Sequence, residues 1–475
     1  MKLSDLDAPS VLILGLGREG QSTWRFLRAL FPDKILAAAD RLPLAELPRE
    51  AGDLLRGDAR VRLHLGPDYL ASLSDYDVIV KSPGIPVTLP EYARAVAAGR
   101  RITSQTDLFI SNCPGTIVGV TGTKGKSTTA SLIYAILSQS GREAYLVGNI
   151  GAPALDLLPQ ADPESLFVYE LSSHQLEGLR QSPHIAVLLS VVPEHLDYYE
   201  SFAQYVAAKE NIARYQTPRD WLVYDSDHAI PREIAARAPG RRLACSLDQL
   251  SVPGCAVVRD WIVCALEEER QEEVVRLRDV PLPGRFNLLN VAAAVAVGRI
   301  LGVDAGDIAA AVQQFHQLEH RLERVGTYGG ITFYNDAIAT VPEATIAALD
   351  TLGEDVETIL LGGADRRLDF FRLAERLIHS AIRTVILFPP TGSRIWQAVC
   401  KQEPAAAVRF RHFYVDSMEE AVALAKEHTT QGRICLHSPA SPSFGLFRDY
   451  RDRGEQFKRL VLEGERTEPQ RHKDH

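Results

Sequence analysis

The fold-deciding stretch of this sequence is Thr116-Ile117-Val118-Gly119-Val120-Thr121-Gly122-Thr123-Lys124-Gly125-Lys126-Ser127-Thr128. Its first residues are β-branched and apolar, as in a buried strand, and the residues that follow it are compatible with a helix. A glycine-rich turn between a strand and a helix is typical of a phosphate-binding loop, in which backbone N–H groups and the helix N-terminus hold phosphate oxygens. In such a loop Lys126 would reach the outer phosphates of a nucleoside triphosphate, and the Ser127 hydroxyl would bind Mg2+.

This loop departs from the general GxxxxGKS pattern, because position 120 is valine and Gly119 lies one residue too far back. An ordinary glycine-rich turn is the alternative interpretation. The sequence GTKGKS between a strand and a helix favours phosphate binding. The residues expected to contact the triphosphate are Gly122, Thr123, Lys124, Gly125, Lys126, Ser127 and Thr128.

Length and composition indicate an ordinary globular protein of several domains. The 475 residues exceed one compact core, and 46% of them are hydrophobic and 24% charged. The net charge of -9 argues against nucleic acid as the main partner, so anion binding must be local. The N-terminus lacks a basic region followed by an apolar core, and no later segment is apolar for long enough to span a membrane. We expect a cytoplasmic protein without a membrane anchor.

The six cysteines are scattered, without a CxxC pair and without zinc-ligand spacing. This distribution predicts reduced thiols, as in a cytosol.

A second glycine pattern lies near the N-terminus. A predicted strand at 11–14 leads into Gly15, Gly17 and Gly20, and Asp40 follows the next predicted strand at 35–39. This GxGxxG arrangement with a later acid is found in dinucleotide-binding folds, although a tight strand-to-helix packing turn gives the same pattern. Another predicted strand, 78–80, also leads into a candidate loop at the carboxyl edge of a sheet. The candidate nucleotide-binding residues of this region are Gly15, Gly17, Gly20, Asp40, Ser82, Pro83 and Gly84.

The middle of the chain places acids and a histidine after predicted strands. Glu170 ends an apolar strand and could hold Mg2+. A second strand, predicted at 187–192, leads to His195, which in isolation would be an ordinary polar loop residue. Its place in the block that carries the triphosphate loop favours a functional role instead. Lys209, on a helix predicted at 205–212, would by default be a solvated helix lysine.

Three α/β blocks follow from these elements. We expect an N-terminal Rossmann-like domain at 1–112, a central P-loop ATPase-type domain with a parallel sheet at 113–317, and a C-terminal Rossmann-like domain at 318–475.

Short segments spread over almost the whole chain also form one pattern. They are Gly122–Ser127, Gly148–Gly151, Glu170–Ser173, Gln175–Glu177, Glu194–Asp197, Ala207–Lys209, Asn287–Asn290, His320-Arg321, Asn335-Asp336, Leu361–Gly363 and Ser438–Phe444. Together they resemble the Mur ligases of bacterial peptidoglycan synthesis, and within them the glutamate-adding MurD branch.

The resemblance implies an ATP-dependent ligase of three domains that joins glutamate to UDP-N-acetylmuramoyl-L-alanine through an acyl phosphate. The first glycine loop would then hold a uridine nucleotide rather than NAD, which makes a nicotinamide oxidoreductase a poor alternative. It also implies that Ser127 and Glu170 hold one Mg2+, that His195 serves a second metal, and that Lys209 is carbamylated. Further implied contacts are Asn149 and Ser172 to the muramoyl-alanyl group, Asn287, Arg321 and Asp336 to ATP, and Arg366, Ser443 and Tyr450 to glutamate. A monomer is expected.

Departures from the MurD pattern concern the amino acid. Where the common phrase has a lysine, this chain has Ile338, and Arg366 aligns with another lysine that binds a glutamate carboxylate. These features are similar to a divergent branch that includes an L-glutamate-adding enzyme. D-glutamate is expected as the commoner family substrate, and L-glutamate is the alternative. A nucleotide-binding protein that has lost its chemistry is a further alternative, although a binding module would need neither His195 nor Lys209.

Overall fold

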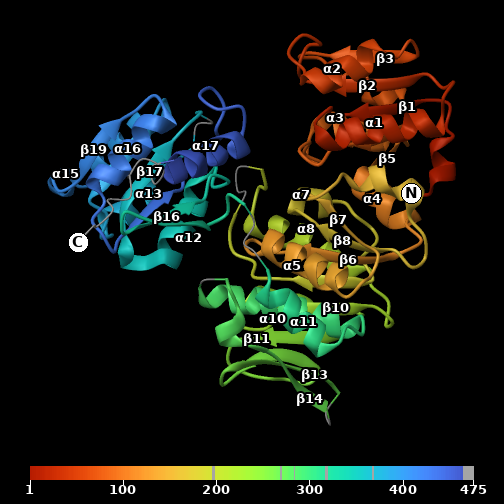
Figure 1. The fold of residues 1–475 in the computed structure, drawn as a ribbon. Helices are drawn as coiled ribbons and strands as arrows, with labels where there is room; N and C mark the ends of the chain where they lie inside the picture. The colour runs from red at the N-terminus through yellow and green to blue at the C-terminus, as the bar shows by residue number, and fades with distance from the viewer. Residues whose placement is uncertain (195–197, 268–269, 283, 316–318, 366–367, 464–475) are drawn as a thin grey trace, which may run out of the picture. The chain divides into compact units, whose positions relative to one another are not determined.

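The computed structural model describes residues 1–194, 198–267, 270–282, 284–315, 319–365 and 368–463. Three sheets flanked by helices follow one another along the chain (Figure 1). The predicted α/β class is confirmed.

The first sheet has the strand order β3-β2-β1-β4-β5, with every neighbouring pair parallel. Alternate residues of β1 face two different hydrophobic clusters, which explains its continuous apolar sequence. Its carboxyl end leads into the glycine loop and α1. The elements are β1 (Val11–Leu14), α1 (Arg18–Leu30), β2 (Leu36–Asp40), α2 (Arg49–Arg56), β3 (Val61–Leu65), β4 (Val78–Lys81), α3 (Pro90–Ala97), β5 (Arg101–Ser104) and α4 (Gln105–Asn112).

The second sheet has the order β14-β13-β12-β11-β10-β9-β6-β8-β7, and its neighbouring strands are parallel except in the pairs β12–β13 and β13–β14, which are antiparallel. Its strands are β6 (Thr116–Thr121), β7 (Ala144–Gly148), β8 (Leu166–Glu170), β9 (Ile185–Leu188), β10 (Trp221–Asp225), β11 (Arg241–Ser246), β12 (Gly254–Val258), β13 (Trp261–Glu267) and β14 (Arg270–Arg276). Its helices are α5 (Lys126–Gln139), α6 (Ala154–Leu157), α7 (Ser173–Leu176), α8 (Phe202–Arg214), α9 (Ala229–Arg237), α10 (Arg285–Ile300) and α11 (Ala305–Gln313).

One strand of this sheet is shorter than the sequence predicts. β9 ends at Leu188, whereas the apolar run predicted a strand to Val192. The Leu189 N–H still donates to the carbonyl of Thr121, the last residue of β6, at 2.9 Å, but the Ser190 carbonyl accepts from the Thr123 N–H of the triphosphate loop at 2.7 Å. The apolar residues after β9 therefore support the loop rather than extend the sheet.

The third sheet has the order β15-β16-β20-β17-β18-β19, and only β15 and β16 pair antiparallel. Its strands are β15 (Glu323–Tyr328), β16 (Ile331–Asn335), β17 (Val356–Gly362), β18 (Thr384–Phe388), β19 (Arg411–Tyr414) and β20 (Ile434–His437). Its helices are α12 (Pro342–Leu352), α13 (Phe371–Ile378), α14 (Thr391–Gln402), α15 (Pro404–Ala407), α16 (Met418–His428) and α17 (Tyr450–Glu463).

The chain forms two compact units. The first two sheets lie in one unit, made of Met1–Pro281 and Arg285–Phe315, and the third sheet lies in the other. This division does not place the boundary predicted at residue 112, and the residues around 317 lie outside the described ranges. Both predicted boundaries, 112 and 317, therefore stay predictions.

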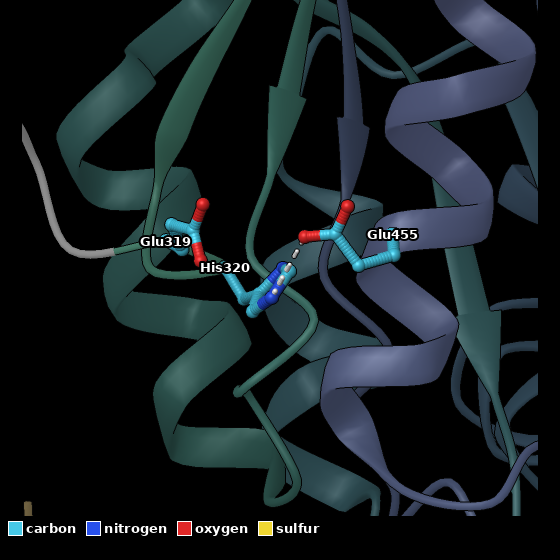
Figure 2. A group of neighbouring side chains, drawn as sticks. All are labelled: Glu319, His320 and Glu455. Carbon is cyan, nitrogen blue, oxygen red and sulfur yellow. Dashed lines mark ion pairs between the residues drawn. The ribbon is translucent and has the colours of Figure 1, made fainter.

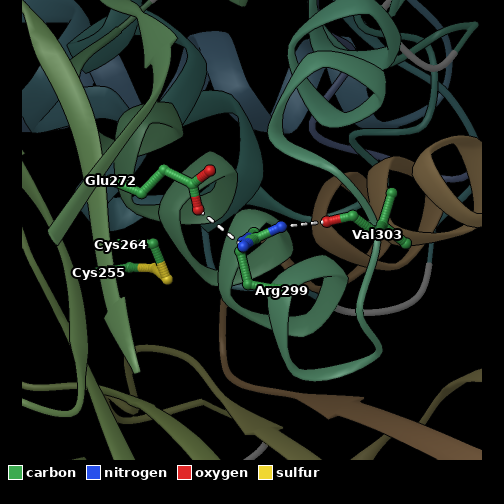
Figure 3. Close-up of a disulfide and its surroundings, with 5 residues drawn as sticks. All are labelled: Cys255, Cys264, Glu272, Arg299 and Val303. Carbon is green, nitrogen blue, oxygen red and sulfur yellow. Dashed lines mark hydrogen bonds and ion pairs between the residues drawn. A yellow bond between two sulfur atoms is a disulfide. The ribbon is translucent and has the colours of Figure 1, made fainter. Parts of the chain in front are cut away.

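Two of the six cysteines form a disulfide. Cys255 and Cys264 face each other across β12 and β13 and are bonded, close to the ion pair between Arg299 and Glu272 (Figure 3). The prediction that the thiols are reduced is wrong for this pair. Linear spacing did not reveal it, because only the register of the two strands brings the two sulfurs together.

Among the described residues, no helix combines the length and the apolar character needed to cross a membrane.

Candidate active site

The triphosphate loop lies between β6 and α5, as the sequence predicts. Gly122 and Gly125 have φ angles of +157° and +82°, which L side chains rarely adopt. A Cβ on Gly125 would lie 2.3 Å from the Asn290 Oδ1 on α10. The Thr123 hydroxyl accepts a hydrogen bond from the Val192 N–H and lies 3.0 Å from the Tyr205 hydroxyl. The loop thus packs against α10, against α8 and against the segment that follows β9.

Two lysines converge on one carbonyl of this loop. Lys126 Nζ donates to the Gly122 carbonyl at 3.0 Å and to the Thr123 carbonyl at 2.9 Å. Lys209 Nζ donates to the same Gly122 carbonyl at 2.8 Å. Lys209 is only 1% exposed, so the default interpretation of a solvated helix lysine is wrong. Burial, with a smaller effect of the Lys126 charge, lowers the pKa of Lys209 well below its ordinary value, which favours the uncharged amine.

An unpaired carboxylate oxygen lies at the same edge of the sheet. Glu170 ends β8 and lies opposite Val120 in the neighbouring β6, at the point where the loop begins. The side chain is 3% exposed, and its Oε2 is buried without a hydrogen-bond partner among the described residues. Such an atom is costly unless a cation or donor reaches it. Ser127, the other predicted magnesium ligand, is the second residue of α5 and is buried.

His195 lies outside the described residues, so its predicted metal role is not placed. The preceding Glu194 lies 3.7 Å from Lys124 Nζ, which connects that segment to the loop. Thr128 and Lys124 are half-buried on the loop and the first turn of α5.

Two neighbours of the loop were not predicted from the sequence. Tyr205 precedes Lys209 by four residues on α8, and Lys209 Nζ lies 4.8 Å from its ring centroid. Asn290 follows Asn287 by three residues on α10, and its Nδ2 donates to the Asn287 Oδ1 at 2.9 Å. In both cases the helical spacing of three or four residues from a predicted site residue is a signal that could have found them.

The first glycine loop is closed by its own residues. The Ser82 hydroxyl donates to the Gly15 carbonyl at 2.9 Å, and a Cβ on Gly15 would lie 2.9 Å from Ser82. Asp40 accepts hydrogen bonds from the Leu16 N–H at 2.7 Å and from the Leu42 N–H at 3.0 Å. Gly17 has open space where a side chain would stand. Gly20 packs against the Gly15 carbonyl, and Pro83 and Gly84 continue the loop after β4.

The two residues predicted to contact the muramoyl-alanyl group lie on loops of the second sheet. Asn149 follows β7 and is exposed, and its backbone N–H donates to the Glu170 carbonyl at 3.3 Å. Ser172 caps α7, where its hydroxyl accepts from the Gln175 N–H.

In the second unit, Asp336 lies after β16 and is almost fully buried. It accepts hydrogen bonds from the Ser438 hydroxyl at 2.7 Å and from the Leu322 N–H at 3.1 Å. Arg321 stands between two left-handed residues, His320 with φ of +65° and Leu322 with φ of +45°. This turn fixes the Arg321 backbone beside the Asp336 carboxylate, so the two predicted ATP contacts belong to one local structure.

The predicted glutamate contacts are only partly described. Arg366 lies outside the described residues. Ser443 is buried, and Tyr450 begins α17 with its ring centroid 6.1 Å from that of His320. The backbone N–H of Ile338 donates to the His320 carbonyl at 3.1 Å, so the segment that lacks the usual lysine is attached to the Arg321 turn.

Glu319, His320 and Glu455 lie close enough together to suggest a metal centre (Figure 2). Lys458 already serves as the cation there, with its Nζ 3.4 Å from Glu319 and 2.8 Å from Glu455. Asn335 Nδ2 lies 2.9 Å from the His320 Nδ1 and also donates to Glu323, which favours an acceptor Nδ1 and a protonated Nε2 facing Glu455. The cluster therefore holds the Arg321 turn in place and is not assigned to a metal.

Three family models match the chain in order. They are the MurD-like N-terminal domain of Mur ligases at residues 9–104, the Mur ligase middle domain at 120–298, and the Mur ligase glutamate ligase domain at 320–441.

Two relatives that match along almost the whole chain carry the same name. The chain is 37% identical over 452 residues to the UDP-N-acetylmuramoylalanine–D-glutamate ligase of Symbiobacterium thermophilum, covering 94% of this chain and 97% of that protein. It is 34% identical to the ligase of the same name from Koribacter versatilis, with 96% and 98% covered.

Solved structures share the fold. The UDP-N-acetylmuramate–alanine ligase MurC of Thermotoga maritima superposes with a TM-score of 0.55 at 16% identity, covering 97% of this chain and 100% of that one. The MurF ligase of the same organism, solved in complex with ADP, gives a TM-score of 0.53 at 18% identity, with 96% and 95% covered.

Proposed function

The chain belongs to the Mur ligase family, and from that membership we propose that it joins glutamate to UDP-N-acetylmuramoyl-L-alanine in an ATP-dependent reaction of peptidoglycan synthesis. D-glutamate is the proposed amino acid, because the whole-length relatives are named as D-glutamate ligases. The cytoplasmic location and the monomeric state expected from the sequence remain predictions, as does the absence of nucleic-acid and membrane partners.

The observation that carries the proposal is the meeting, at one phosphate loop, of two lysines and a carboxylate with one buried oxygen that has no hydrogen-bond partner among the described residues. Lys126 and Lys209 both donate to the Gly122 carbonyl, and Glu170 supplies an acceptor for a cation. A module that only held a nucleotide would need Lys126 but would gain nothing from a buried second lysine. This combination supports phosphoryl transfer.

The proposed chemistry follows from the poor electrophilicity of a carboxylate. An oxygen of the L-alanyl carboxylate attacks the γ-phosphorus of ATP, the bond to the β-phosphate oxygen breaks, and ADP leaves. The glutamate amine then attacks the acyl carbon, forms the C–N bond and loses a proton, and inorganic phosphate departs. Both reacting partners of the first step are anionic, so positioning and positive charge on the loop dominate catalysis.

Magnesium fits the residues of this loop. Glu170 Oε2 is a buried oxygen in need of a partner, and hard cations prefer carboxylate and hydroxyl oxygens. Ser127 and Glu170 are proposed to hold the ion, which would screen the phosphate charges. His195 is proposed to serve a second metal on the strength of the sequence pattern alone.

Lys209 is proposed to carry a carbamate. Burial lowers the pKa of its amine, and the uncharged amine is the form that adds carbon dioxide, with release of one proton. The product is an anion attached to α8 beside the phosphate loop, where it would act as a further metal ligand. Without the carbamate, a protonated Lys209 would instead repel the ammonium group of Lys126.

Other site assignments stay proposals from the family pattern. The first glycine loop with Asp40 and the Ser82-Pro83-Gly84 segment would hold the uridine diphosphate, and Asn149 and Ser172 the muramoyl-alanyl group. Asn287, Arg321 and Asp336 would hold ATP, while Arg366, Ser443 and Tyr450 would hold glutamate.

Incubation with ATP, Mg2+, UDP-N-acetylmuramoyl-L-alanine and either glutamate enantiomer tests the function directly. We expect phosphate release and a product heavier by one glutamyl residue with D-glutamate, measured by a phosphate assay and mass spectrometry. The Lys126→Met variant is the background control. Turnover with L-glutamate alone would move the chain to the L-adding activity, and no turnover with either enantiomer would refute the proposal.

Replacing Glu170 by glutamine is expected to weaken the magnesium response. Because the amide is a neutral and poorer ligand, we expect a rate loss on the order of 100-fold at saturating ATP and a higher Mg2+ concentration for half-maximal rate. The measurement is a Mg2+ titration of the initial rate. Glu164→Gln, an exposed carboxylate just before the same strand, is the matched control. A Glu170→Gln titration that superposes on the wild type would exclude Glu170 as a ligand.

A further inference from the structure

The first turn of α1 reaches from the first glycine loop to the second sheet. The glycine pattern explains Gly15, Gly17 and Gly20, but it gives no role to the two residues between Gly17 and Gly20. These are Arg18 and Glu19, which begin α1 directly after its N-cap, Gly17. Both side chains bond loops of the second sheet within the same compact unit.

Glu19 contacts the α7 turn. Its Oε1 accepts a hydrogen bond from Gln175 Nε2 at 2.6 Å, and its backbone carbonyl accepts one from Gln105 Nε2 at 3.1 Å. Its Oε2 is buried and has no hydrogen-bond partner among the described residues. One carboxyl oxygen of Glu19 is therefore hydrogen-bonded to Gln175, and the other has no hydrogen-bond partner among the described residues.

Gln175 passes this contact to Ser172. The Gln175 Oε1 accepts from the Ser172 N–H at 2.8 Å and from its hydroxyl at 3.1 Å, while the Gln175 N–H donates back to that hydroxyl at 3.2 Å. This reciprocal capping fixes the Ser172 side chain. Two hydrogen-bonded steps thus connect the first glycine loop to Ser172, a proposed acceptor contact.

Arg18 makes the parallel connection to the other acceptor loop. Its guanidinium donates to the Gly151 carbonyl and lies 3.5 Å from the carbonyls of Gly148 and Asn149. The turn that carries Asn149 is therefore tied to the same turn of α1. Both loops assigned to the muramoyl-alanyl group are attached to the segment that would hold the diphosphate.

The protonation state of Glu19 affects how well the N-terminus of α1 can bind a diphosphate. Burial raises the pKa of Glu19 to about 7, although Gln175, Arg18 and Lys81 act in the opposite direction. The groups that face it are Arg18 on its own helix, Lys81 at the end of β4, Tyr169 on β8 and Gln175 on α7, and Lys81 in turn faces Glu177. A helix N-terminus attracts a diphosphate, whereas an ionised carboxylate in its first turn repels one. The protonated carboxyl removes that repulsion.

We propose that Arg18 and Glu19 are positioning residues for the nucleotide-sugar acceptor, which hold the Asn149 and Ser172 loops in register with the diphosphate-binding turn of α1. The inference rests on the proposed function, since it concerns the acceptor of that reaction. It assigns no role to these residues toward ATP or glutamate, whose proposed contacts lie elsewhere.

An exchange of the two hydrogen-bonding partners tests the proposal. Gln175→Glu places a second carboxyl against Glu19 and removes the amide donor, whereas the double variant Glu19→Gln with Gln175→Glu restores a donor and an acceptor in reversed order. We expect Gln175→Glu and Glu19→Ala to raise the KM for UDP-N-acetylmuramoyl-L-alanine about 10-fold, the size expected for the loss of one buried hydrogen bond. The double variant is expected to return most of that loss. The KM for ATP should stay within about 2-fold of the wild type in all of them.

A pH profile adds a readout that a purely structural role would not move. Glu19 is protonated below about pH 7 in the folded protein and ionises above it, so the acceptor KM of the wild type should rise as the pH rises through 7. Glu19→Gln keeps an acceptor for Gln175 but cannot ionise, so its acceptor KM should stay flat from pH 6 to 9. Glu233→Gln, an exposed carboxylate on α9, is the matched control and should follow the wild-type profile.

Calorimetric titration with UDP-N-acetylmuramoyl-L-alanine separates this inference from the proposed function. An inactive wild type would refute the ligase reaction, while acceptor binding could still be compared among the variants. Acceptor affinity unchanged in Glu19→Ala and Gln175→Glu would overturn the positioning role. An equal loss for all three substrates, or a double variant no better than Gln175→Glu, would overturn it as well. Thermal melts check that each variant is folded.

Discussion

Lys209→Ala is expected to abolish turnover, by about 1,000-fold or more, and formate or acetate is expected to restore part of it. The reason is that Lys209 is a buried amine that bonds the Gly122 carbonyl, and burial and the Lys126 charge lower its pKa well below its ordinary value. Its proposed carbamate would supply a negative ligand at the loop. The alanine variant leaves a gap in which a small carboxylate can take the place of that group.

Two comparisons sharpen this experiment. Lys209→Arg should be equally inactive and should not respond to formate, because arginine fills the space but cannot form the carbamate. Lys401→Ala removes an exposed lysine of α14 and should keep wild-type activity. The initial rate with and without added formate is the measurement, and thermal melts report on folding. Wild-type turnover in Lys209→Ala, or rescue of Lys209→Arg, would contradict the assigned role.

Gly125→Ala is expected to lower kcat/KM for ATP on the order of 100-fold or more, since small misplacements of a catalytic loop have effects of that size. Gly125 is left-handed, and an added Cβ would lie 2.3 Å from the Asn290 Oδ1, so either α10 or the loop must move. Asn290 also donates a hydrogen bond to Asn287, a proposed ATP contact, so a displacement of Asn290 would also displace Asn287. The loop would lose the shape that aims its N–H groups at phosphate.

Gly141→Ala is the matched control for backbone strain. Gly141 has a φ of +77°, but nothing lies within 4 Å of its added Cβ. Gly141→Ala should therefore lose about 1–2 kcal/mol of unfolding free energy from the left-handed conformation alone, and Gly125→Ala should lose more because its Cβ also meets Asn290, as measured by denaturant unfolding. Only Gly125→Ala should lower kcat/KM for ATP. Equal kinetic losses in the two variants would show that strain, and not the contact with Asn290, determines the effect.

Local sequence patterns were sufficient for the features that depend on one segment. The strand, loop and helix around Gly122 follow from an apolar run, glycines and helix-compatible residues in direct succession. Glu170 was predicted at a strand end for the same reason, and the structure places it beside the loop because β8 pairs with β6. The first glycine loop was found in the same way.

Features that depend on distant segments could not be read from the sequence pattern. Lys209 resembles any helix lysine until α8 packs against β6, and only then is its amine buried. The apolar run after Leu188 predicts a strand. The sequence pattern could not show that Ser190 instead bonds Thr123, which lies far away in the chain. The disulfide between Cys255 and Cys264 depends on the register of a hairpin. The role of Glu19 depends on its contact with Gln175, 156 positions later.

The double hydrogen bond at the Gly122 carbonyl has a consequence for ATP affinity. When a lysine moves from a buried carbonyl to a bound phosphate, the carbonyl oxygen normally loses its hydrogen bond, and the free energy of that loss opposes binding. Here Lys209 stays on the carbonyl when Lys126 departs, and even a carbamylated nitrogen retains one N–H to donate. The Gly122 carbonyl would thus keep a donor in the empty and the loaded loop, so its contact opposes ATP binding little, whereas the Thr123 carbonyl would lose the donor that Lys126 supplies.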